Sequence, residues 1–192
     1  MNVIKPKGIN LTLQGGRSHG AFTWGVLDRL LQDDCLEIEA MTGAISGAIN
    51  AAIMVYGYAK GGREGAGDSL RNFWNLLSME SIEFDYMRSN CQTKLFLATA
   101  HVRTGKLKIF ENCDMSIDTL LASACLPSIH HPVQIDGEIY RDGGLAANPP
   151  VFLLIFNCKN RDIINYGCKA TGDSGHTHKR RGNTRTNVGY RF

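Results

Sequence analysis

Residues 38–52 read I-E-A-M-T-G-A-I-S-G-A-I-N-A-A, and this stretch decides the fold. The apolar run that ends at Thr42 predicts a strand, and the small residues after Gly47 predict a closely packed helix. Gly43 and Gly47 flank a turn whose apex is Ile45. A strand, a turn flanked by glycines and a buried helix form the geometry called a nucleophile elbow. Such an elbow holds its apex residue in a strained backbone conformation at the top of the sheet.

The residue at this apex decides the chemistry. An acyl hydrolase has serine there, whereas this chain has Ile45, followed by Ser46. A β-branched residue is poorly suited to a positive φ, and such strain costs about 1–3 kcal/mol. Ser46 is either a displaced nucleophile or the N-cap of the next helix, and the pattern favours the N-cap. We therefore predict an elbow without its usual nucleophile.

A second strand–turn–helix unit opens the chain. Residues 9–13 form an apolar, strand-like run, and the apolar residues within 21–31 have helical spacing. Between them, residues 15–20 read G-G-R-S-H-G. The backbone N–H groups of such a turn, together with the helix N-terminus behind it, can hold a phosphate or a tetrahedral oxyanion.

The remaining segments alternate in pattern. Asp136-Gly137 predicts a tight hairpin, and Asp142-Gly143-Gly144 is a polar turn at a strand end. We predict strands at 36–41, 94–100, 107–110, 133–135 and 138–140, helices at 69–77 and 117–125, a turn over 61–67, and no clear period over 78–92. This alternation favours an α/β protein with helices on both faces of its sheet.

Charge is distributed unevenly along the chain. Residues 167–192 hold six basic side chains against Asp173, a charge of +5 within a chain of net +3, which leaves −2 for residues 1–166. We expect a globular domain at 8–165 and a basic, disordered tail at 166–192, because the tail has few apolar residues to bury. The body carries no basic surface for nucleic acid, so no nucleic-acid partner is expected.

The cysteines and histidines show no metal-ligand spacing, so no metal site is expected. Scattered cysteines within apolar segments are typical of buried thiols in a reducing compartment. No apolar run is long enough to span a bilayer, and no secretory signal is apparent. These features predict a soluble, cytoplasmic protein that can contact a membrane surface.

Four blocks then occur in a specific order. They are L-T-L-Q-G-G-R-S-H-G-A-F-T-W-G-V-L from residue 11, T-G-A-I-S-G-A-I-N-A-A from 42, A-S-A-C-L-P from 122 and D-G-E-I-Y-R-D-G-G-L-A-A-N-P from 136. In these blocks the chain resembles the bacterial patatin-like phospholipases over most of residues 8–165. The resemblance implies a three-layer α/β fold and a Ser–Asp dyad that hydrolyses acyl esters of lipids without a cofactor.

The resemblance also assigns roles to individual residues. Asp142 takes the position of the dyad base, and Gly15, Gly16, Arg17 and Gly20 belong to the oxyanion loop. Arg17 stands where the family has the middle glycine of this loop. The family's longer helical segment between Ser78 and Glu83 is shortened here, and its C-terminal layer after Tyr166 is replaced by the basic tail.

Three functions follow from these residues. The first is a lipid acyl hydrolase that is impaired because Ile45 replaces the nucleophile. The second is a catalytically inactive protein that binds lipid without turnover. The third is a nucleotide-binding domain, in which the Gly-rich turn holds phosphate and Glu37 contacts a ribose.

Overall fold

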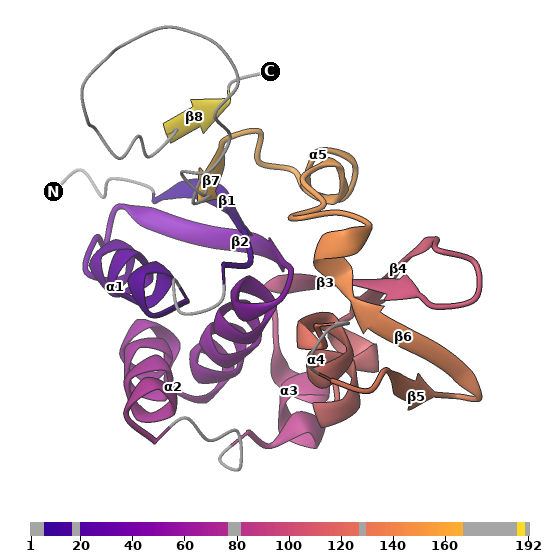
Figure 1. Cartoon of the computed structure of the whole chain (residues 1–192). Helices are drawn as coiled ribbons and strands as arrows, with labels where there is room; N and C mark the ends of the chain where they lie inside the picture. The colour runs from indigo at the N-terminus through magenta and orange to yellow at the C-terminus, as the bar shows by residue number, and fades with distance from the viewer. Residues whose placement is uncertain (1–5, 17–19, 77–81, 127–129, 167–187, 191–192) are drawn as a thin grey trace, which may run out of the picture.

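The computed structural model in Figure 1 describes residues 6–16, 20–76, 82–126, 130–166 and 188–190. The strands are β1 (Lys7–Leu13), β2 (Leu36–Gly43), β3 (Lys94–His101), β4 (Leu107–Glu111), β5 (Val133–Ile135), β6 (Glu138–Asp142), β7 (Ile163–Tyr166) and β8 (Val188–Tyr190). The helices are α1 (Gly20–Leu31), α2 (Ser46–Leu76), α3 (Phe84–Asn90), α4 (Ile117–Ala124) and α5 (Phe152–Asn157), with 3-10 turns η2 (Asn112–Asp114) and η3 (Gly143–Leu145).

One mixed sheet runs through the molecule. Its described strands lie in the order β5-β6-β3-β2-β1-β7-β8, with β4 paired to β3. The four central strands, β7, β1, β2 and β3, are parallel to one another. The outer strands β4, β5, β6 and β8 pair antiparallel with their neighbours. The carboxyl ends of the central parallel strands therefore meet at one edge, which is where open α/β sheets place their ligand sites.

Helices cover both faces of this sheet. The larger core joins α1, α2 and α4 to one face through residues such as Leu11, Ile53 and Leu120. On the other face, Leu154 of α5 packs with Ala40 and Phe96 in a smaller cluster. Figure 1 shows α5 apart from the other helices, across the sheet. The predicted α/β fold with helices on both faces is confirmed.

The turn predicted over residues 61–67 is present in helix α2 only at its first two residues. Only Gly61 and Gly62 leave helical geometry, with Gly62 at φ 58°, and the chain then continues as helix to Leu76. Five glycines between 57 and 67 made the predicted turn too long, because glycine is a weak helix former. Gly57 and Gly65 are instead closely packed: a Cβ on Gly57 would lie 2.4 Å from the Gly65 carbonyl oxygen. Helix α3 was also missed, since its seven residues are too few to show a period.

The C-terminal segment is described only at residues 188–190. There Val188–Tyr190 form β8, which pairs antiparallel with β7. The rest of 167–192 lies outside the described residues, so the expectation of a disordered tail stays a prediction. Among the described cysteines, Cys35 and Cys113 are exposed, against the prediction that the thiols are buried. No described helix has the length and apolar content needed to cross a membrane.

Strand β3 places two turns next to each other. Its residues 94–97 pair with β2, and its residues 99–101 pair with β6. Strand β4 pairs with residues 96–100 of β3, a range that overlaps both of these pairings. It therefore lies along one edge of β3, whereas β2 and β6 follow one another along the other edge. Gly43, the last residue of β2, pairs with Leu97, and Asp142 pairs with Thr99 only two residues further. The elbow and the Asp142 turn therefore start side by side.

Candidate active site

The elbow has the geometry that the sequence predicts. Ile45 has φ 56°, the left-handed region that is unfavourable for a β-branched side chain. Close packing enforces this turn, because a Cβ on Gly47 would lie 2.1 Å from the backbone oxygen of Leu13. Helix α2 must therefore begin against the end of β1, and the apex residue has no room to relax. The strain at Ile45 is imposed by its glycine neighbours.

Asp142 ends β6 and is almost completely buried, with 4% of its surface exposed. Its carboxylate accepts a hydrogen bond from the Gly144 N–H at 2.7 Å. Burial raises the pKa of this carboxyl above its usual value, and the Gly144 N–H only partly opposes that rise. A buried acid with a perturbed pKa is a candidate for a functional site.

Ile45 and Asp142 face the same small space. A Cβ built on Gly144 would lie 2.9 Å from Ile45 Cδ1 and 3.0 Å from Asp142 Oδ1, so these two atoms are separated by no more than the sum of those distances. A Cβ on Gly15 would lie 2.7 Å from the same Ile45 Cδ1. The Ile45 side chain therefore fills the gap between the Gly-rich loop and the Asp142 turn.

The first two glycines of the loop already have partners. Gly15 N–H donates to Asn148 Oδ1 at 2.8 Å, and Gly16 N–H donates to Ser46 Oγ at 3.2 Å. Arg17 lies outside the described residues. Gly20, at the start of α1, fits only as glycine, because a Cβ there would lie 2.8 Å from Ser46 Cβ. Protein groups thus occupy the donors that would hold an oxyanion at the start of the loop.

Ser46 takes a different direction from Ile45. It is the first residue of α2 and is buried, and its Cβ faces Gly20. The N-cap role favoured by the sequence is wrong, since helix α2 begins at Ser46 itself and the hydroxyl accepts from Gly16 across the loop. Among the described residues, the hydrogen-bond donor to the Asp142 carboxylate is Gly144 and not Ser46.

Three comparisons with known proteins show what this arrangement resembles. The family described as Patatin-like phospholipase matches residues 66–155, a range that contains the Asp142 turn. Over these residues the chain is similar to the patatin-like phospholipases. The fold is also similar to VipD from Legionella pneumophila, with a TM-score of 0.51 and 11% sequence identity. The aligned part covers 76% of this chain and 47% of VipD, so the chain spans about half of that protein, and the likeness shows the fold alone. No curated protein matches the sequence.

Within this patatin-like fold, two asparagines lie at the site, and their contacts were not predicted from the sequence. Asn148 lies in the last family block, after the Asp142 turn in the sequence. Its side-chain oxygen accepts the hydrogen bond from the Gly15 N–H. Asn50 is fully buried in α2, donates to the Gly20 carbonyl at 2.9 Å and accepts from Trp74 Nε1 at 2.8 Å. A polar residue inside the apolar run 48–56 was the available signal for Asn50, because buried amides need partners.

The nucleotide alternative does not fit this patatin-like fold. Glu37 pairs with Gly8 near the start of β1, whereas the Gly-rich loop follows the end of that strand. The two are therefore separated by the length of the strand, roughly 20 Å, too far for one ribose and its phosphate. The described residues also contain no cluster of three or more His, Cys, Asp or Glu that could hold a metal ion.

Proposed function

We propose that this patatin-like domain binds acyl esters of lipids at the edge between the elbow, the Gly-rich loop and Asp142, and that its hydrolytic step is lost or strongly impaired. The observation that carries the proposal is Ile45 at the elbow apex, with φ 56° and its Cδ1 between Gly15 and Gly144. A hydrocarbon side chain there cannot attack an ester carbonyl.

The expected reaction shows what is missing. In the dyad that the family resemblance implies, the apex serine oxygen attacks the ester carbonyl while the aspartate takes its proton. Asp142 is buried with a raised pKa and is suited to that second role. Loss of the nucleophile of a serine hydrolase lowers kcat on the order of a millionfold. We therefore expect turnover close to the uncatalysed rate.

Ser46 does not replace the missing group in this proposal. Its oxygen is held by the Gly16 N–H, on the side of the elbow that faces α1. A nucleophile must lie within hydrogen-bond reach of its base, roughly 3 Å. The proton acceptor for Ser46 would have to be Asp142, whose carboxylate is hydrogen-bonded to Gly144 instead.

Hydrolysis of a short-chain nitrophenyl ester and of a phospholipid tests the proposal. We expect no turnover by the unaltered chain, a measurable rate for the double variant Ile45→Ser/Ser46→Ala, and loss of that rate when Asp142→Asn is added. Ile139→Ser, at a half-exposed position on β6, is the matched control for adding a serine without changing the elbow.

Binding needs a separate measurement. A fluorescent acyl lipid should bind the unaltered chain and should be displaced by unlabelled lipid. Esterase activity of the unaltered chain that disappears with Ser46→Ala would overturn the proposal and make Ser46 the nucleophile. Activity that survives Ser46→Ala but requires Asp142 would also overturn it, in favour of another nucleophile.

A further inference from the structure

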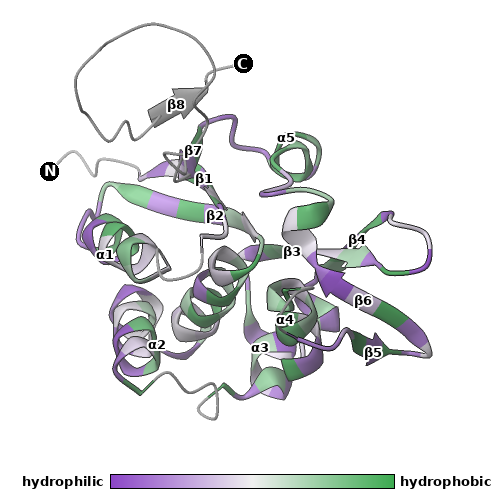
Figure 2. Cartoon of the chain, viewed as in Figure 1, coloured by the Kyte–Doolittle hydropathy of each residue, from purple (hydrophilic) through white to green (hydrophobic). Residues whose placement is uncertain are grey.

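Helix α5 exposes more apolar surface than its short length would require. Its sequence is F-L-L-I-F-N, and Leu154 is the one residue of the helix that is fully buried. Phe152 and Phe156 are 45% and 82% exposed and, four residues apart, share one face of the helix. A helix that is apolar on all sides is normally covered by protein or lipid. Figure 2 shows α5 as a strongly hydrophobic helix at the margin of the molecule.

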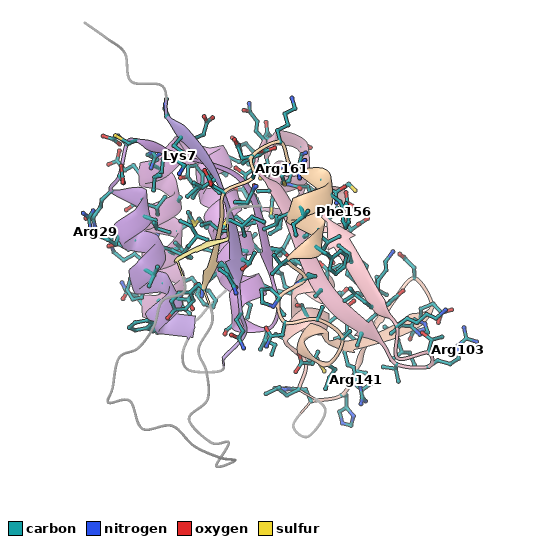
Figure 3. The ribbon with its side chains drawn as sticks, turned by 90° about the horizontal axis from the view of Figure 1, so that it is seen from above. Lys7, Arg29, Arg103, Arg141, Phe156 and Arg161 are labelled. Carbon is teal, nitrogen blue, oxygen red and sulfur yellow. The ribbon has the colours of Figure 1, made fainter. Side chains whose placement is uncertain are left out.

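Cationic side chains gather at the C-terminal end of this helix. Lys94 Nζ donates to the Asn157 carbonyl at 2.6 Å, and Arg161 donates to the Ile155 carbonyl at 3.3 Å. Lys159 lies between these contacts in sequence and is exposed. Figure 3 shows Phe156 and Arg161 on the same part of the surface.

Two neighbouring carboxylates, Glu39 and Asp162, offset this charge only in part, and Glu39 interacts electrostatically with Lys94. Glu39 accepts hydrogen bonds from the backbone N–H groups of Lys159 and Asn160. Asp162 forms an ion pair with Lys7 at 3.0 Å. The surface around Phe156 thus combines two exposed phenylalanines with the positive charges of Lys94, Lys159 and Arg161.

We propose that this surface, the α5 face (Phe152, Phe156, Lys94, Lys159 and Arg161), docks on an anionic lipid surface. Phenylalanine rings enter the headgroup–acyl boundary, and lysine and arginine beside them meet the negative headgroups. A second copy of the chain would need apolar complementarity but would gain nothing from the cluster of cations, so the charges favour lipid. The α5 face lies across the sheet from α1 and α2, and it is distinct from the edge proposed above to bind the acyl ester.

The position of α5 connects this docking to the site. Asn148, which accepts from Gly15, is four residues before Phe152 in the chain. A lipid surface that holds α5 would therefore lie near the segment that is hydrogen-bonded to the Gly-rich loop. The inference does not depend on turnover, because it concerns only where the domain rests.

Sedimentation of the full chain with vesicles tests the proposal. The probes are vesicles of phosphatidylcholine alone and of phosphatidylcholine with phosphatidylserine, at low and high salt. Phe152→Ser/Phe156→Ser removes the apolar part of the α5 face. The matched control is Ile117→Ser/Leu121→Ser, another pair four residues apart, 44% and 43% exposed on α4. Lys159→Gln removes one exposed charge.

We expect binding to the anionic vesicles that weakens with salt. The two phenylalanine substitutions should lower the partition coefficient about tenfold, Lys159→Gln should lower it about fivefold, and the α4 pair should leave it unchanged. Thermal unfolding of each variant verifies that it is folded. Ester hydrolysis and binding of monomeric acyl lipid are measured in parallel, so a failure of docking is distinguishable from a failure of the proposed function.

Three results would overturn the inference. The first is absence of vesicle binding by the unaltered chain. The second is anionic binding that persists after Phe152→Ser/Phe156→Ser, which would assign it to the basic residues within 167–192. The third is a dimer in solution that the phenylalanine substitutions dissociate, which would make the α5 face a contact between copies of this chain.

Discussion

The turn after β2 and the turn after β6 lie beside each other on β3, yet only the second carries the residue type that the family resemblance implies there. The Asp142 turn keeps both its geometry and its acid, which is buried and hydrogen-bonded to Gly144. The elbow keeps its geometry, with Ile45 at φ 56°, but carries no nucleophile at the apex. Backbone shape and chemical function are therefore specified by different residues.

Close packing explains why the elbow keeps its shape without serine. Gly47 approaches the end of β1, and Gly143 approaches β3 so closely that a Cβ would lie 1.9 Å from the Ala98 oxygen. Neither contact involves the apex side chain. The turn is thus built from strand ends and glycines, and it tolerates a residue that its conformation disfavours.

The largest expected effect comes from filling these contacts. Gly47→Ala and Gly143→Ala each force a methyl group onto a backbone oxygen, and each should lower the free energy of unfolding by more than about 4 kcal/mol. Gly25→Ala is the matched control, because nothing lies within 4 Å of its Cβ position in α1. It should stabilise by about 0.5–1 kcal/mol. Urea denaturation measures all three, and a mild effect at Gly47 would show that packing does not hold the elbow.

A smaller effect is expected where the two turns are tied together. Asn148→Ala leaves the partly buried Gly15 N–H without its acceptor, which should cost about 1–3 kcal/mol. Asn148→Asp keeps an acceptor oxygen and should lose less. The same denaturation experiment separates the two variants. Equal losses would indicate that Asn148 acts through its volume and not through the hydrogen bond to Gly15.

The smallest effect concerns the acid itself. Burial raises the folded-state pKa of Asp142 above its ordinary value of 3.8. Between those two values the folded state binds more protons than the unfolded state, so stability falls as pH rises through the folded pKa. Asp142→Asn should therefore raise Tm at pH 7, and the gain should disappear below pH 3.8. A gain that is the same at both pH values would show that the charge is not its cause.

Much of this edge could be predicted from the sequence because local chemistry determines it. Asp136-Gly137 has φ 50° and 81° in the hairpin that its residue types predict, and the glycine spacing around Ile45 correctly indicated an elbow. The order of the strands, and the change of partner along β3 from β2 to β6, could not be predicted in this way. They depend on pairing between residues 39 to 54 positions apart.

Side-chain partners were less predictable than backbone shape. Ser46 was expected to cap its own helix, but its hydroxyl accepts from Gly16, thirty residues earlier in the chain. Gly61 and Gly62 interrupt helix α2 without ending it, because buried contacts at Ala66 and Leu70 hold the second half against the core. In both places tertiary contacts outweigh the local preference.

The hydrogen bonds around Asn50 have an optical consequence. The chain has two tryptophans, Trp24 and Trp74, whose rings stack with centroids 6.4 Å apart and an interplanar angle of 9°. The Asn50 side chain accepts a hydrogen bond from Trp74 and donates one to the Gly20 carbonyl, at the start of α1. All tryptophan emission therefore originates from one contact beside the elbow. Its wavelength and the near-ultraviolet circular dichroism of the stacked pair should report movement of that loop, while events at α5 leave both signals unchanged.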